Sequence, residues 1–199
     1  MKLKVSKGNS KMGSISSVSL PAIITCRDCD CHSKCYARKI EKLRPIVHNT
    51  YLSNLELLNN EPDVFWRELE ASIMTSRFFR FHVSGDIPDA VYFAHMIEVA
   101  ERNPHCEILC STKKYEIVNQ HLDFGGKIPS NLHIIFSAWI GLEMSNPFSL
   151  PEAHVRYKDG STTASNSAIE CSGNCTECAI AGEGCWVLKS GEQVIFNEH

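Results

Sequence analysis

The chain has 199 residues, 43% of them hydrophobic, which suits one compact domain with its own core. Its formal net charge of -3 gives no general positive field to attract nucleic acid, although four lysines lie among the first eleven residues. The sequence shows neither an apolar run long enough to span a membrane nor a secretory signal, so we expect a cytoplasmic protein without a membrane partner.

The N-terminal region combines a polar arm with the first predicted strand. Residues 1–19 are rich in Lys, Ser and Gly and lack a sustained apolar period, which predicts an irregular or extended arm. The β-branched residues of 18–25 predict a strand, and Pro21 restricts this strand to a sheet edge. The strand would run directly into Cys26.

Helices and strands are predicted to alternate along the rest of the chain. Phe65, Leu69 and Ile73 recur at four-residue steps behind Pro62, a pattern typical of a helix. Repeated units of this kind predict an α/β fold, in which right-handed βαβ units form a partial barrel or an open, mostly parallel sheet. The predicted helices cover 36–43, 49–58, 62–74, 88–102 and 115–122, and the predicted strands cover 78–83, 107–111, 131–138 and 153–157.

We expect residues 1–199 to form a single domain. Besides the arm, it would contain an α/β core over 20–158 and a cysteine-rich segment over 165–199 that packs on this core. Because the C-terminal ends of parallel strands meet at one edge of a sheet, polar residues should gather there. The segments expected at this edge are 26–35, 84–86, 111–113 and 137–139.

Ten cysteines in a chain that is neither small nor exported indicate reduced thiols rather than a disulfide scaffold. Eight of them form two tight groups, and thiols gathered in this way are typical of a soft-metal site. Cys106 and Cys110 lie within or beside a predicted strand and are interpreted as core residues. The N-terminal group is Cys26, Cys29, Cys31 and Cys35, and the C-terminal group is Cys171, Cys175, Cys178 and Cys185.

Both groups are predicted to bind metal. The N-terminal group lies beside a predicted helix start, whose N–H groups and dipole stabilise thiolates. The C-terminal group, followed by Trp186, can complete a tetrahedral zinc site or a four-cysteine iron–sulfur cluster. Zinc ribbons usually repeat a tight Cys-x2-Cys knuckle, whereas this group has a single one and uneven gaps. We therefore favour one or two [4Fe-4S] clusters, with zinc as the alternative.

Six short motifs follow one another along the chain. They are Gly8-Asn9-Ser10-Lys11-Met12-Gly13, Ser19-Leu20-Pro21, Thr25-Cys26, Cys31-x3-Cys35-Tyr36-Ala37, His82-Val83-Ser84-Gly85-Asp86, and Cys175-x2-Cys178 with Cys185-Trp186. In this order they resemble the bacteriophage family described as gene product 88, over nearly the whole chain. The resemblance implies a location in the cytoplasm of the host cell.

The chain is also similar, in part, to radical S-adenosylmethionine (SAM) proteins, which have a cysteine loop after the first strand and a Gly-Gly-Glu turn after the second. Ser84-Gly85-Asp86 stands in the place of that turn. The resemblance implies that Asp86 accepts a hydrogen bond from an ammonium group, and a turn that caps the next helix is the alternative. It also implies that Lys113 is an anion partner and Trp139 a stacking face at the same edge.

The cysteine spacings match those of radical SAM proteins only in part. Those proteins hold a four-iron cluster through Cys-x3-Cys-x2-Cys and leave one iron open for SAM. Cys31 and Cys35 match two of the ligands, and Cys26 or Cys29 would have to supply the third. The C-terminal group contains the full spacing, but Cys185 can fill the fourth position, which implies an auxiliary or electron-transfer cluster.

We therefore hypothesise a phage-encoded iron–sulfur protein with a radical-SAM-like core, acting in electron transfer or in SAM-dependent radical chemistry. Its partner would be a small molecule or a redox partner. The alternative is a zinc-stabilised structural or binding module without catalysis. A third hypothesis is nucleic-acid binding through the N-terminal lysines and the basic stretch 38–44, which the net charge disfavours.

Overall fold

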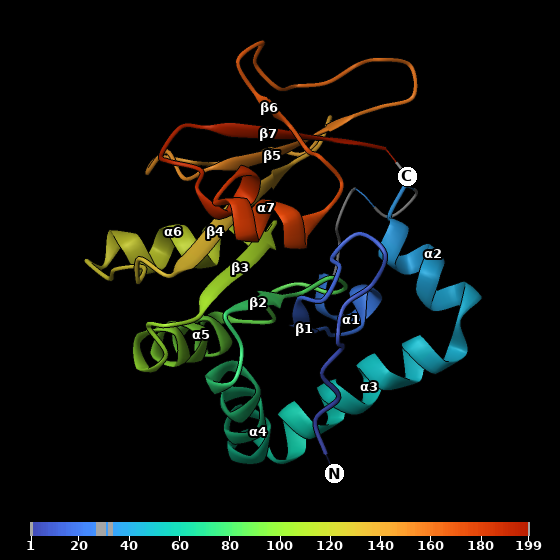
Figure 1. Ribbon diagram of the computed structural model, residues 1–199, viewed down its shortest axis with the longest axis vertical. Coiled ribbons are helices and arrows are strands. Elements are labelled where there is room, and N and C mark those ends of the chain that lie inside the picture. The colour runs from blue at the N-terminus through green and yellow to red at the C-terminus, as the bar shows by residue number, and fades with distance from the viewer. Residues whose placement is uncertain (1, 27–30, 32–33, 199) are drawn as a thin grey trace.

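Seven parallel strands form one open sheet in the computed structural model, which describes residues 2–26, 31 and 34–198 (Figure 1). The strand order is β1-β2-β3-β4-β5-β7-β6, so the first five strands lie beside their neighbours in sequence. This arrangement confirms the predicted α/β fold with a parallel sheet. The strands are β1 (Ser16–Val18), β2 (Phe78–Phe81), β3 (Glu107–Thr112), β4 (Leu132–Ala138), β5 (Glu152–Arg156), β6 (Ile169–Glu170) and β7 (Gln193–Asn197).

Several helices begin at residues that suit a helix N-terminus. Pro45 and Pro62 stand in the first turns of α3 and α4, where a missing N–H costs no helical hydrogen bond. The Asp89 side chain accepts a hydrogen bond from the Tyr92 N–H at the start of α5. The helices are α1 (Ala22–Cys26), α2 (Tyr36–Leu43), α3 (Pro45–Asn60), α4 (Pro62–Met74), α5 (Ala90–Arg102), α6 (Tyr115–Asp123), α7 (Cys175–Ala181) and the short 3-10 helix η2 (Gly184–Trp186).

Different parts of the chain cover the two faces of the sheet. Successive strand residues point to opposite faces, so Phe79 and Phe81 pack in the core with α4, α5 and α6, whereas Phe78 packs on the other face. On that second face, called the inner face here, Ala179 of α7 and Trp186 of η2 pack against the strands. Figure 1 accordingly shows α7 lying over the middle of the sheet.

The predicted strand over 18–25 is wrong, because a strand and a helix divide this segment. β1 ends at Val18, and α1 follows after a short connection. Glu41 of α2 stabilises the helix start, since its Oε1 accepts a hydrogen bond from the Ala22 N–H at 2.9 Å. Pro21 has no N–H to donate to a sheet ladder, so the chain leaves the sheet before it.

The N-terminal arm is more ordered than the sequence predicts. Ser6 and Ser17 form an antiparallel bridge with two backbone hydrogen bonds of 2.8 and 2.9 Å. Leu3 is buried in the core on the face covered by α4, α5 and α6, which we call the helix-covered face. Met12 and Ile15 are buried on the inner face. The arm therefore folds back along β1 and contributes to both cores.

The C-terminal segment supplies strands as well as packing on the core. β7 lies between β5 and β6 and pairs in parallel with both, and neither β6 nor β7 was predicted. Val194 of β7 is buried in the core of the inner face. Because α7 and η2 connect β6 to β7, the C-terminal cysteines are held between two strands of the sheet.

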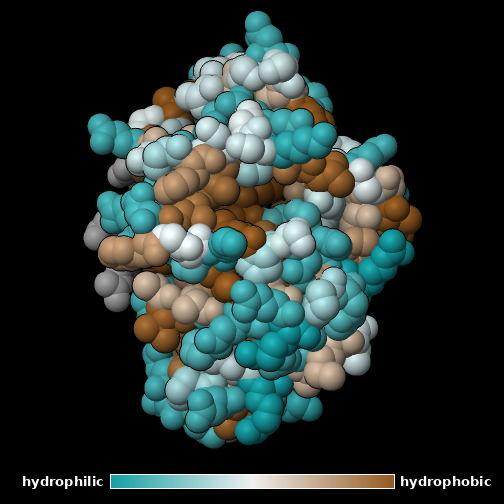
Figure 2. Space-filling view, turned by 90° about the vertical axis from the view of Figure 1, so that its left-hand side faces the viewer, coloured by the Kyte–Doolittle hydropathy of each residue, from teal (hydrophilic) through white to brown (hydrophobic). Residues whose placement is uncertain are grey.

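The surface is mostly polar. Figure 2 shows hydrophobic residues gathered in a hollow on one side of the molecule, surrounded by mainly hydrophilic residues. Among the residues that the structure describes, no helix combines the length and the apolarity needed to cross a bilayer.

Candidate metal centre

The four C-terminal cysteines line one cavity. The cavity has a volume of about 300 Å³ and lies between the inner face of the sheet and the segment from β6 to η2. Leu109, Trp186 and Val194 give it apolar walls. The folded chain thus brings together all the predicted ligands of this group. They are Cys171, Cys175, Cys178 and Cys185.

Short elements position the first three of these thiols. Cys171 directly follows β6, and its N–H donates a hydrogen bond to Ile195 O of β7 at 2.9 Å. The Asn174 side chain caps the start of α7. Cys175 and Cys178 are three residues apart in this helix and therefore lie on the same side of it.

A tight turn after α7 brings Cys185 to the same cavity. Gly182 ends the helix in the left-handed conformation, with φ of 69°, and the Glu183 N–H donates to Cys178 O at 2.9 Å. A Cβ on Gly184 would lie 3.3 Å from the Cys178 sulfur. Glycine at this position therefore lets η2 pack closely against α7.

The N-terminal arm holds the start of α7. Lys11 O accepts a hydrogen bond from the Cys175 N–H at 2.9 Å, and Met12 O accepts one from Thr176 Oγ1 at 2.7 Å. Gly13 has φ of 61°, and a Cβ there would lie only 2.3 Å from Thr176 Oγ1. The Gly-Asn-Ser-Lys-Met-Gly motif of the arm therefore holds α7, which carries Cys175 and Cys178, in its position. We call this contact the seat of α7.

Burial makes two of the C-terminal thiols, Cys175 and Cys185, difficult to ionise. It raises the pKa of Cys185 to about 12, and it also raises the pKa of Cys175. Cys171 and Cys178 add to both shifts, because neighbouring thiolates repel one another, whereas the positive charge of Arg80 opposes them. These mutual effects show that the sulfurs lie within electrostatic reach of one another. A metal that binds them must displace protons.

The donor set and the cavity fit a group larger than one ion. Four cysteine thiolates are the usual ligands of a [4Fe-4S] cluster. Within residues 2–26, 31 and 34–198, no three His, Cys, Asp or Glu side chains are arranged to hold a single metal ion. The four cysteines instead line, together with other residues, a cavity of about 300 Å³.

Arg80 of β2 also lines this cavity, although the sequence analysis did not identify it. The signal was present in the strand itself. In the sequence Phe78–Phe81, an arginine stands between Phe79 and Phe81, and it must face the opposite side of the sheet from both. A charge in a buried strand is uncommon and indicates a special environment.

The described N-terminal cysteines lie around the start of α2. Cys26 is the last residue of α1, Cys31 is buried, and Cys35 immediately precedes α2. Cys29, the fourth predicted ligand of this group, lies outside the described residues. Cys35, Cys106, Cys110 and the four C-terminal cysteines are free thiols.

Cys35 ionises more easily than an ordinary thiol. A hydrogen bond from the Cys31 side chain is the largest effect that lowers its pKa, to about 5, while burial opposes the shift. The N–H groups of Ala37 and Arg38 at the start of α2, and the charge of Lys113, lower the pKa further. Cys35 is therefore a thiolate at neutral pH.

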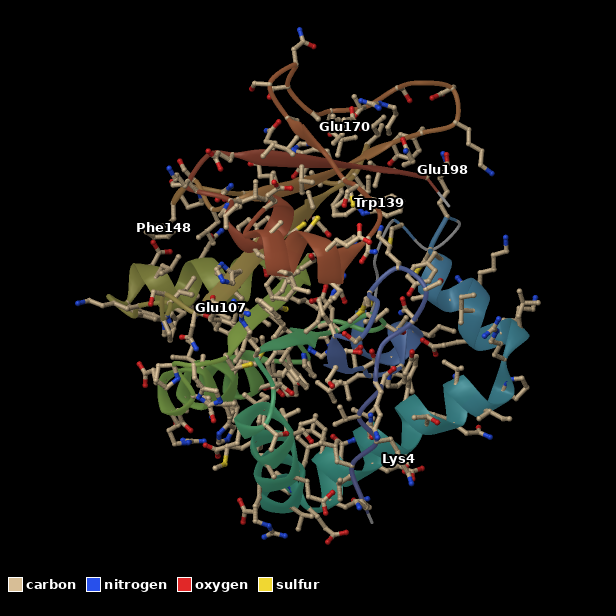
Figure 3. The ribbon with its side chains drawn as sticks, viewed as in Figure 1. Lys4, Glu107, Trp139, Phe148, Glu170 and Glu198 are labelled. Atoms are coloured by element: carbon tan, nitrogen blue, oxygen red, sulfur yellow. The ribbon has the colours of Figure 1, made fainter. Side chains whose placement is uncertain are left out.

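A second cavity, of about 270 Å³, lies beside one of these thiols, Cys31. Its lining includes Cys31, Trp139 and Tyr157, and the two aromatic ring centroids are 6.2 Å apart. Lys113 Nζ lies 5.3 Å from the centroid of the Trp139 ring. Figure 3 shows Trp139 on the side of the molecule where α2 begins. The structure thus places Trp139, the predicted stacking face, near both Cys31, a predicted metal ligand, and Lys113, the predicted anion partner.

The predicted turn Ser84-Gly85-Asp86 lies at the strand ends but is not in the lining of either of these two cavities. Asp86 is buried, and its Oδ1 accepts a hydrogen bond from Thr112 Oγ1 at 2.6 Å. Its Oδ2 accepts one from the Lys113 N–H at 2.9 Å. The Asp86 carboxylate therefore connects the end of β2 to the end of β3.

Comparison with known proteins gives one match. A protein-family model described as Gene product 88 matches residues 2–153. The matched region contains the N-terminal arm, the N-terminal cysteines and Arg80, and it ends within β5. The C-terminal cysteines lie beyond it. No curated protein and no solved structure matches the chain.

Proposed function

This chain belongs to the gene product 88 family, and from that premise we propose that it is a phage-encoded iron–sulfur protein that acts in electron transfer. The observation that carries the proposal is the single cavity of about 300 Å³ lined by four thiols. When bound, a cluster there would supply one-electron chemistry. The residues that would hold it are Cys171, Cys175, Cys178 and Cys185.

The shape of the cavity favours a cluster over zinc. A structural zinc ion needs only a small site, about 2.3 Å in radius, whereas the four thiols share a cavity of about 300 Å³ with apolar residues. Leu109 and Trp186 wall the cavity with apolar surface, and such a surround controls solvent access and hence the reduction potential of a cluster. A zinc-stabilised structural or binding module without catalysis is the alternative.

The second cavity supports a second candidate function, SAM-dependent radical chemistry. Parallel strands in sequential order are compatible with a radical-SAM-like partial barrel. The N-terminal cysteines would hold a second cluster with an open iron, and Lys113 and Trp139 would contact SAM beside Cys31. For Asp86 to bind an ammonium group as well, its carboxylate would have to release Thr112 or the Lys113 N–H.

We also propose that the protein works in the cytoplasm of the host cell. Thiols remain reduced in that compartment, and the four C-terminal cysteines are free thiols. The partner in electron transfer would be a redox protein or a small molecule.

The proposal is tested on protein purified without oxygen, by visible absorption and by counting iron, sulfide and zinc on the same sample. We expect a broad sulfur-to-iron charge-transfer band and about four irons for each filled group. Cys185→Ser should remove the iron of the C-terminal group. About two zinc ions per chain without that band would contradict the proposal and favour the zinc module.

Cys106→Ala is the matched control for this experiment. Cys106 is as fully buried as a core residue and lies on the helix-covered face, away from both cavities. The Cys106→Ala variant therefore lacks one thiol but keeps every predicted metal ligand. Equal loss of iron in Cys106→Ala and Cys185→Ser would mean that the cavity thiols have no special part in binding.

A further inference from the structure

Arg80 places a positive charge on the inner face, in the second strand of the sheet. It is in register with Ser17 of β1 and Leu109 of β3, so it lies in the middle strand of three. Its side chain lines the C-terminal cavity. Its Nε is shielded from solvent and makes no hydrogen bond with any part of the chain that the structure describes. Such a group is costly unless an anion neutralises it.

The carboxylates in the same lining leave that charge unneutralised. Glu170 lies at the cavity but is engaged by Arg156, whose Nη1 donates to Glu170 Oε2 at 3.1 Å. Glu183, the other carboxylate of the lining, is exposed to solvent. The four thiols are the remaining groups in the lining that can become anions.

We propose that Arg80 is the counter-cation of the group held by the four C-terminal thiolates, and that its charge raises the reduction potential of that group. The inference rests on the iron–sulfur function proposed above. A cluster with four thiolate ligands becomes one charge more negative when it takes an electron from a low-potential reductant. A nearby positive charge in a weakly polar cavity therefore stabilises the reduced state more than the oxidised state.

The geometry of the cavity supports this assignment. Arg80 and the four cysteines line the same cavity, and Leu109, which is in register with Arg80, forms part of its apolar wall. Lys11 is not in the cavity lining, and its Nζ lies 4.5 Å from the centroid of the Phe196 ring, a cation–π contact. Arg80 is thus the cation of the cavity lining.

The test is a redox titration of anaerobically purified protein, with dithionite as reductant, followed by visible absorption and electron paramagnetic resonance. Arg80→Gln removes the charge and keeps a polar side chain, whereas Arg80→Lys keeps the charge. Arg77→Gln is the matched control, because Arg77 is an exposed arginine three residues earlier whose guanidinium lies 5.1 Å from the Phe78 ring centroid.

We expect Arg80→Gln to disfavour reduction of the cluster about tenfold, which lowers its midpoint potential by about 59 mV for one electron. Arg80→Lys should recover most of this shift, and Arg77→Gln should leave the potential unchanged. An unaltered potential in Arg80→Gln protein with full iron content would overturn the assignment.

If Arg80→Gln protein does not bind the cluster, the iron content of Arg80→Lys protein decides whether the charge of Arg80 is needed. Iron retained by the lysine variant supports the role of the charge, and iron lost from both variants overturns it in favour of a purely structural guanidinium. Circular dichroism of each variant shows whether the chain has folded. Wild-type protein without iron is a separate result, because it contradicts the proposed function itself.

Discussion

The two cysteine groups differ in what controls the ionisation of their thiols. Cys35 receives a hydrogen bond from Cys31 at the start of a helix, and its pKa falls to about 5. Cys185 is partly buried against the inner face of the sheet, and this burial raises its pKa to about 12. The N-terminal group is therefore partly anionic before any metal arrives, whereas Cys185 of the C-terminal group must lose its proton as a metal binds.

The groups also differ in how the chain holds them. The N-terminal cysteines lie within the region matched by the family model, next to α1 and α2. The C-terminal cysteines lie beyond that region, between β6 and β7. Even so, the matched arm supplies Lys11 O as the acceptor for the Cys175 N–H. One part of the chain thus builds the seat for a site carried by another part.

Gly13→Val should have the largest effect, because it disturbs that seat. Its Cβ would lie 2.3 Å from Thr176 Oγ1, and the positive φ of 61° is unfavourable for a β-branched residue. The backbone strain alone costs on the order of 1–3 kcal/mol. We expect α7 to shift and the iron content to fall to that of Cys185→Ser, with the iron of the N-terminal group retained.

Gly125→Val is the control for this prediction. Gly125 also has a positive φ, of 81°, but no atom lies within 4 Å of the position of its Cβ. It therefore introduces comparable backbone strain far from the cysteine segment. Full iron content in Gly13→Val would show that the arm does not seat the C-terminal site.

The second prediction concerns metal-free, reduced protein treated with iodoacetamide. Near neutral pH we expect Cys35 to be alkylated at least tenfold faster than Cys185, as measured by mass spectrometry of the modified peptides. Thiolate abundance drives the difference, although the weaker nucleophilicity of a low-pKa thiolate reduces it. Acidification to about pH 5 should halve the Cys35 rate, because its pKa is about 5.

Cys106 provides the comparison for burial alone. Burial raises its pKa to about 12, and it belongs to neither cysteine group. We expect it to react as slowly as Cys185, and both rates to rise about tenfold for each pH unit above neutrality. Fast alkylation of Cys185 at neutral pH would contradict the contrast between the two groups.

The sheet and one of its edges could be predicted from local patterns. Alternation of helices and strands identified the parallel sheet, and strand ends then placed Lys113 and Trp139 near each other, as the 5.3 Å contact shows. The close spacing of the four C-terminal cysteines also predicted that they form one group, and all four line one cavity. These features depend on short stretches of sequence and on the general geometry of βαβ units.

Contacts between distant segments could not be predicted in this way. The hydrogen bond between Thr176 and Met12 joins residues 164 positions apart, and neither segment carries a local signal for the other. The position of β7 could not be predicted either. It lies between β5 and β6 because the segment with α7 and η2 leads the chain back into the sheet there. Whether Arg80 faces the thiols likewise depends on which face the C-terminal segment covers.

The smallest expected effects separate the causes of the low Cys35 pKa. Cys31→Ala removes the hydrogen bond that is the largest favourable effect, so the pKa should rise from about 5 toward the ordinary value of 9.0. Lys113→Met removes a weaker, longer-range effect and should raise the pKa less. The pH dependence of Cys35 alkylation measures both. A larger shift in Lys113→Met would mean that charge, rather than the hydrogen bond, dominates.

The same variants should alter the pH dependence of stability in metal-free protein. Because folding lowers the pKa of Cys35, the thiolate stabilises the fold above the unfolded value of 9.0, and this contribution declines as the pH falls toward 5. Cys31→Ala should flatten the slope of unfolding free energy in that window more than Lys113→Met does. Urea titrations at several pH values measure the slope. An unchanged slope in Cys31→Ala would mean that the N-terminal thiolate is not stabilised by its neighbour, and the contrast with the buried C-terminal thiols would then rest on burial alone.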